Sequence, residues 1–175
     1  MDAKVKQYIN DLSDWVRNGY CLEIPLLNIE ELVNRMGGRL LIDKSGAYYD
    51  GTIRKVGDTE FEIKISSSQG NERKNFTVAH ELGHLFIHMG FRTDYMLWNS
   101  QGVNDIYHRF GNSEQEIQAN EFAASILMPR ECFIEKVNRC TNLADNTVDI
   151  AKVAAQFNVS TSAAIYRGKN LGVLI

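Results

Sequence analysis

The chain has 175 residues, of which 44% are hydrophobic and 23% are charged, and its net charge is −3. These values are typical of a soluble globular protein, and the length suits one well-packed domain. The slight acidity excludes a general attraction to nucleic acid or anionic membranes, and no apolar run is long enough to span a bilayer. The three cysteines lack C-x-x-C spacing, and the N-terminus lacks the apolar segment of a signal peptide. We therefore expect reduced thiols in a cytoplasmic protein.

The first third of the chain predicts two helices followed by strands. Apolar residues at helical spacing indicate a helix over 2–17. A second, short helix is expected after Asn28, which begins a capping-box pattern with Glu31. The hydrophobic spacing then changes to that of strands, with Gly57-Asp58 as a hairpin turn between the last two. The predicted strands cover residues 39–43, 47–56 and 59–66.

Residues 76–88 carry His80, Glu81 and His84 in the order H-E-x-x-H, on a segment predicted to be helical from about residue 74 to 89. Four helical residues turn about 400°, so the two histidines lie on one face and can share one Zn²⁺. Glu81 is rotated about 100° from His80, where its carboxylate can take a proton from metal-bound water. The alternative is a core helix whose histidines bond to backbone. The apolar surroundings favour a metal, which would satisfy all three buried polar residues.

Two further residues of this helix carry information. Gly83 costs about 1 kcal/mol relative to alanine in a helix, which indicates close approach of another element that the sequence does not identify. His88 continues the face of His84 and could be taken for a ligand. We expect it instead to pack or to support a ligand.

The segment 91–112 has no clean period and is rich in aromatic residues. It predicts either an ordered loop near the active site or a loop that covers exposed core. Hydrolysis at such a site also needs a side chain that stabilises the oxyanion or contacts the substrate. The candidates are His108, Tyr107 and Tyr95, and the sequence does not choose among them.

A second helix is predicted over residues 113–128. On it Glu116 and Asn120 continue an otherwise apolar face, and of the three glutamates in this segment only Glu116 is expected to face inward. Glu116 is therefore the candidate for a third zinc ligand, with Asn120 placed to hydrogen-bond a ligand. The competing interpretation makes Glu116 the last residue of a capping box that begins at Ser113.

The C-terminal region predicts more helices. Pro129 suits the first turn of one, and others are expected over 147–157 and 163–171, with a turn at 158–160 between them. This pair superficially resembles a helix-turn-helix. Its second helix carries only Arg167 and Lys169 as basic residues, so we favour a structural pair over a DNA-binding one.

Taken together, these motifs resemble those of the ImmA/IrrE family of metallopeptidases. The strongest matches are Phe76–His84 and the run from Glu116 through Asn120 to Ala124, followed by Ile126–Pro129. Weaker ones lie at 151–160 and 166–172. The resemblance implies a thermolysin-like site with the metal on His80, His84 and Glu116 and with Glu81 as the base. It also implies a typical substrate, a helix-turn-helix transcriptional repressor.

We thus expect an α+β, mostly helical, zincin-like metallopeptidase domain with a small antiparallel or mixed sheet before the active-site helix. One domain would cover 1–175, with N-terminal helices and sheet (1–75), catalytic helices (76–130) and C-terminal helices (131–175). The predicted function is a zinc-dependent endopeptidase with one Zn²⁺ per chain, a protein substrate, and no membrane or DNA partner. The alternative is a non-catalytic regulator that binds a repressor or DNA. As a further hypothesis, strand 61–66 offers a sheet edge to an extended substrate.

Overall fold

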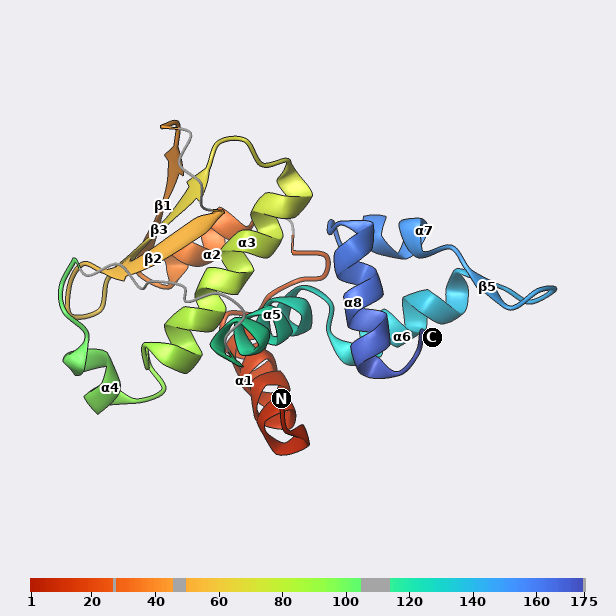
Figure 1. The fold of residues 1–175 in the computed structure, drawn as a ribbon, viewed down its shortest axis with the longest axis horizontal. Helices are drawn as coiled ribbons and strands as arrows, with labels where there is room; N and C mark the ends of the chain where they lie inside the picture. The colour runs from red at the N-terminus through yellow and green to blue at the C-terminus, as the bar shows by residue number, and fades with distance from the viewer. Residues whose placement is uncertain (27, 46–49, 105–113, 175) are drawn as a thin grey trace.

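The computed structural model describes residues 1–26, 28–45, 50–104 and 114–174, and Figure 1 shows its helices and its small sheet. The fold is α+β and mostly helical, as predicted. In chain order the elements are α1 (Ala3–Gly19), α2 (Ile29–Arg35), β1 (Gly38–Asp43), β2 (Gly51–Lys55), β3 (Phe61–Ser66), α3 (Asn71–Gly83), the π-helical turn η1 (His84–His88), α4 (Tyr95–Ser100), α5 (Glu114–Leu127), α6 (Arg130–Arg139), β4 (Thr141–Asn142), β5 (Thr147–Val148), α7 (Ile150–Ala155) and α8 (Thr161–Leu171).

Side-chain caps explain where several helices begin. The carboxylate of Asp2 accepts from the backbone N–H of the residue two positions on, at the start of α1. The predicted cap at Asn28 is confirmed, because its side chain accepts from the Glu31 N–H at 3.0 Å. Ser160 does the same for α8, accepting from Ala163 at 3.2 Å. Each cap satisfies an N–H that the first turn of a helix leaves without an intrahelical partner.

The sheet is mixed, with strand order β1-β3-β2. The predicted hairpin is confirmed: β2 and β3 pair antiparallel, and Val56 N–H donates to Glu60 O at 3.0 Å across the connection. Strand β3 also pairs in parallel with β1, so it is central. The hypothesis that residues 61–66 form a sheet edge is therefore wrong. Alternation reports which face of a strand is buried, but not whether neighbours pair on both sides of it.

Helix α3 lies between the sheet and α5 (Figure 1). Gly83, the last residue of α3 before the π-helical turn η1, explains how closely the two helices approach. A Cβ on Gly83 would lie 2.9 Å from the Ala119 Cα and 3.2 Å from the Phe122 Cβ. The element that the sequence could not identify is thus α5. Because no side chain separates the backbones at this point, residues of α5 can reach the histidines of α3 and η1.

The histidine-bearing helix differs from the prediction in extent and in its last turn. It begins at Asn71, three residues before the expected start, and it becomes a π-helix at His84. There Met89 N–H donates to His84 O at 3.0 Å, an i to i+5 bond. Such turns are common at functional sites, and no local residue preference predicts them. Gly90 has φ +78° and ends the helix, as expected.

The C-terminal region contains α6, the short β4–β5 hairpin, α7 and α8 (Figure 1). The helix predicted from residue 147 is wrong at its start, because Thr147 and Val148 pair with the hairpin strand β4. The helix begins only at Ile150, after Asp149 accepts from the N–H of Lys152 at 3.0 Å. Among the described residues, no helix combines the length and apolar character needed to cross a membrane.

Candidate metal centre

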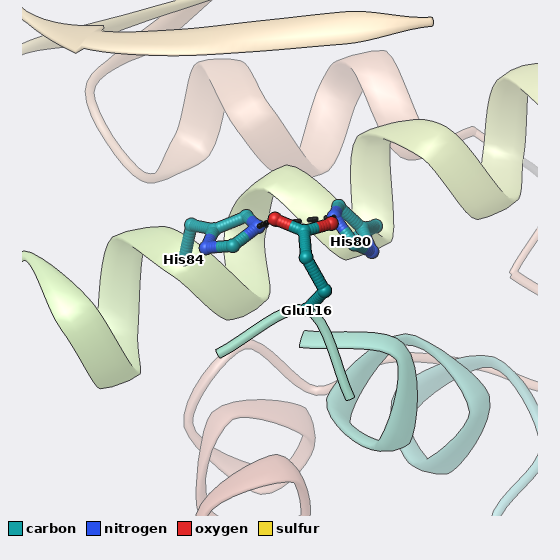
Figure 2. A group of neighbouring side chains, drawn as sticks. All are labelled: His80, His84 and Glu116. Carbon is teal, nitrogen blue, oxygen red and sulfur yellow. Dashed lines mark hydrogen bonds and ion pairs between the residues drawn. The ribbon is translucent and has the colours of Figure 1, made fainter. Parts of the chain in front are cut away.

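Helix α3, the π-helical turn η1 that continues it, and α5 bring His80, His84 and Glu116 together, and Figure 2 shows the carboxylate of Glu116 facing both imidazoles. One oxygen, Oε2, lies 3.2 Å from His80 Nε2, and the other, Oε1, lies 3.2 Å from His84 Nε2. The two Nε2 atoms are 3.0 Å apart. Within the part of the chain that the structure describes, this is the group of His, Cys, Asp or Glu side chains that could hold a metal ion.

The chemistry of these atoms fits a metal. Each histidine uses its other nitrogen for a hydrogen bond: His80 Nδ1 with Asn120 Oδ1 and His84 Nδ1 with His88 Nδ1, both at 2.9 Å. The Nε2 atoms are thereby turned towards Glu116. In a four-coordinate site with metal–nitrogen bonds of about 2.0–2.1 Å, neighbouring ligand atoms lie about 3.3 Å apart. The separations of 3.0–3.2 Å are close to that value.

Burial keeps the imidazole of His84 neutral, as a metal ligand must be. The side chain of His84 is fully buried. Burial, together with the nearby His80 and His88 rings, lowers the pKa of His84 from 6.5 to about 2. Burial also lowers the pKa of His88, and its hydrogen bond to Gln118 partly opposes that shift. A neutral ring offers a lone pair that a protonated ring lacks.

The glutamates of α5 are arranged differently from the prediction in one respect. Glu116 faces the histidines and Glu114 is exposed, but Glu121 is also completely buried. Its carboxylate pairs with Arg167 at 3.0 Å. Glu116 is therefore not alone in facing inward. The reason is that α5 packs against α3 on one side and against α1 and α8 on others, so it has more than one buried face. The capping partner Ser113 lies outside the described residues.

Glu81 is 1% exposed, and the edge strand β2 passes beside it. A Cβ on Gly51, the first residue of β2, would lie 2.9 Å from Glu81 Oε1 and 2.7 Å from the Thr77 Cγ2. Glycine at this position is what lets the strand approach the carboxylate. Sequence reasoning missed Gly51, although a glycine at the start of a strand is a known sign of close backbone approach.

The structure does not bring every predicted site residue to the centre. Asn120 is there, bonded to His80. Tyr95 lies on α4 with its side chain 82% exposed, and a role for it stays a prediction. Tyr107 and His108 lie outside the described residues.

Gln118, which contacts His88, was missed, because the sequence pattern placed it on the polar stripe of α5.

Replacing Glu116 by alanine is expected to lower metal affinity, with zinc as the probe, far more than the same change at Glu114. Loss of a residue that merely supports a ligand lowers metal affinity about 10- to 100-fold, and loss of a ligand should cost at least about 100-fold. Glu114 is the matched control, since it lies on the same helix turn and is exposed. Metal content after dialysis and competition with a chelator measure both. Equal zinc affinity in the two variants would contradict the geometry.

Two comparisons with known proteins bear on this site. The model of the peptidase M78 family, described as the IrrE N-terminal-like domain, matches residues 42–169. The radiation response metalloprotease IrrE of Deinococcus radiodurans is similar to this chain, with 32% identity over 108 residues. That alignment covers 59% of this chain but only 29% of the relative, so the chain spans less than a third of that protein.

Proposed function

The chain belongs to the ImmA/IrrE (M78) family of metallopeptidases, and from that premise we propose that it is a zinc-dependent endopeptidase. The observation that carries the proposal is the convergence of two imidazoles from α3 and η1 with one carboxylate from α5, beside a buried Glu81 next to the first histidine. Nitrogen and carboxylate oxygen are donors that suit zinc. Three protein ligands leave a coordination position open, as a catalytic site requires.

In this mechanism His80, His84 and Glu116 would hold the metal. A zinc ion held there would supply a Lewis acid for the scissile carbonyl and would lower the pKa of the attacking water towards about 7. Glu81 accepts a proton from the attacking water and can return it to the leaving amine. Burial of the Glu81 side chain excludes bulk water from around the base. Gly51 leaves room for that carboxylate beside the sheet edge.

The substrate we propose is a helix-turn-helix transcriptional repressor in the cytoplasm. A protein substrate follows from the peptidase family, and the motifs carry the resemblance that suggests a repressor. An extended segment of such a protein could add a strand to the described sheet only at β1 or β2. Of these edges, β2 is the one beside Glu81.

The rival function, a regulator that binds DNA through α7 and α8, is not favoured. Arg167, one of the two basic residues of α8, is completely buried and paired with Glu121. A guanidinium in that position cannot reach a phosphate. Lys169 is the basic residue of α8 that remains exposed. Neutralising several phosphates needs more charge than this.

The proposal is tested by incubating the purified, zinc-loaded protein with the product of a repressor-like gene encoded beside its own. Two fragments are expected by gel and mass spectrometry, with none when a chelator is present and with cleavage restored by added zinc. A repressor that binds the zinc-loaded protein but stays intact would favour the non-catalytic regulator instead.

A further inference from the structure

A line of three side chains runs from the candidate metal centre to α5. His84 Nδ1 lies 2.9 Å from His88 Nδ1, and His88 Nε2 lies 2.9 Å from Gln118 Oε1. The first two residues belong to the π-helical turn η1, and the third lies on the helix that also carries Glu116. Gln118 is partly buried at this contact.

The direction of these hydrogen bonds follows from the chemistry of the groups. A carbonyl oxygen only accepts, so His88 Nε2 must carry the proton that goes to Gln118 Oε1. A neutral imidazole has one N–H, so His88 Nδ1 is then an acceptor. His84 Nδ1 must therefore be the donor in the contact with His88. This leaves His84 Nε2 unprotonated, with its lone pair on the side of Glu116.

We propose that His88 and Gln118 are positioning residues that hold His84 in the one tautomer able to bind the metal. The orientation of the Gln118 amide matters, because turning it round would reverse the direction of both hydrogen bonds. If Gln118 offered its NH₂ group, His88 Nδ1 would donate to His84 Nδ1, and the proton of His84 would move to Nε2, where it blocks coordination. The proposal rests on the metal site proposed above.

Helix α5 also orients the other histidine, His80, and here it does so by a direct hydrogen bond. Asn120 Oδ1 accepts directly from His80 Nδ1 at 2.9 Å. Both histidines are thus held through their Nδ1 atoms by chains that end in an amide oxygen of α5. Since α5 also carries Glu116, one helix supplies the third ligand and sets the tautomer of the first two. Partners of this kind orient ligands and raise their basicity in metal sites generally.

The experiment compares Gln118→Met with Gln118→Glu in the full chain. Methionine keeps the size of the side chain but removes the acceptor, whereas glutamate keeps an oxygen in place. Gln118→Met is expected to weaken zinc binding about 10- to 100-fold in a chelator competition, and Gln118→Glu to restore it. Gln7→Met, on an exposed part of α1, is the matched control and should bind zinc as the unaltered chain does.

Two readouts separate positioning from general damage. Long-range ¹H–¹⁵N NMR of the zinc-free protein should show His84 protonated at Nδ1 in the unaltered chain and a mixture of tautomers in Gln118→Met. In a His88→Leu background, Gln118→Met should cost nothing more, because Gln118 acts through His88. The comparison in the His88→Leu background stays informative if one variant folds poorly. If the losses of zinc affinity from the two changes add up in the double variant, the proposal is overturned.

The proposal is also overturned if Gln118→Met binds zinc as tightly as Gln7→Met and leaves the His84 tautomer unchanged. That result is distinct from failure of the proposed function. If the chain binds zinc and cleaves a repressor equally well with glutamine or methionine at 118, the proposed function stands and only the positioning role of His88 and Gln118 fails. If the chain binds no zinc while His84 is still protonated at Nδ1, the positioning role stands and the proposed zinc peptidase fails.

Discussion

Glu81→Gln is expected to lower the rate of substrate cleavage by about 10²- to 10⁴-fold while metal content and folding stay unchanged. The amide has the size of the carboxylate, but it cannot accept a proton near neutral pH. Glu81 is not among the three residues whose atoms converge at the candidate metal site, so the proposed ligands are untouched. Cleavage rate, zinc content and thermal stability are measured on the same preparation.

Glu72→Gln provides the control for this change, because Glu72 lies in the first turn of the same helix and is exposed. It should cleave at the rate of the unaltered chain. Undiminished cleavage by Glu81→Gln would remove Glu81 from the mechanism. Loss of zinc in that variant would instead give Glu81 a structural role at the metal.

The second large effect is expected at the buried ion pair between α5 and α8. Arg167 and Glu121 are both completely buried and lie 3.0 Å apart. The guanidinium also donates from Nε to Met128 O at 3.0 Å. The other oxygen of Glu121 accepts from Asn170 Nδ2 at 2.9 Å, and Asn10 of α1 donates to the first at 3.0 Å. Three helices therefore meet at one carboxylate.

Glu121→Ala should lower the free energy of unfolding by about 3–5 kcal/mol, because it leaves the guanidinium of Arg167 buried and unpaired. Urea denaturation measures the change. Glu135→Ala removes an exposed partner of Arg139, and there the loss should stay within about 1 kcal/mol. The double change Glu121→Leu with Arg167→Met should cost less than Glu121→Ala alone, since no charge is left in the core. A loss of under 1 kcal/mol in Glu121→Ala would show that the pair does not anchor α8.

This pair also matters for the metal centre, although it lies on another face of α5. The rotation of α5 about its axis decides whether Glu116 points at α3. Gly83 sets how close α5 comes, and Glu121 holds its opposite face against α1 and α8. The contacts of the C-terminal helix are thus better explained by support of the candidate metal centre than by DNA binding.

Much of the site could be predicted from spacing alone. His80 and His84 are four residues apart on one helix, so their common face follows from helix geometry. The same reasoning placed Glu116 and Asn120 one turn apart on one face of α5. The cap at Asn28, the hairpin at Gly57-Asp58 and the buried alternation of β3 are equally local.

The features that were predicted wrongly or missed all depend on contacts between residues far apart in the sequence. Whether β3 is central depends on β1, which precedes it by about twenty residues in sequence. The burial of Glu121 depends on Arg167, which lies 46 residues further along the chain. Gln118 makes its contact only because His88 is turned towards it from η1. None of these partners can be identified from the residues next to the one concerned.

The residues alone indicated which donor atoms share a helix face and which face of β3 is buried, because both depend on periods of 3.6 and 2 residues. The hairpin followed from its Gly57-Asp58 turn. Which faces meet depends on the tertiary structure. The approach of α5 to Gly83, the order of the strands, the buried pair at Glu121 and the contact of Gln118 with His88 all depend on packing between distant segments. Packing is a property of the whole core, and local periodicity carries no information about it.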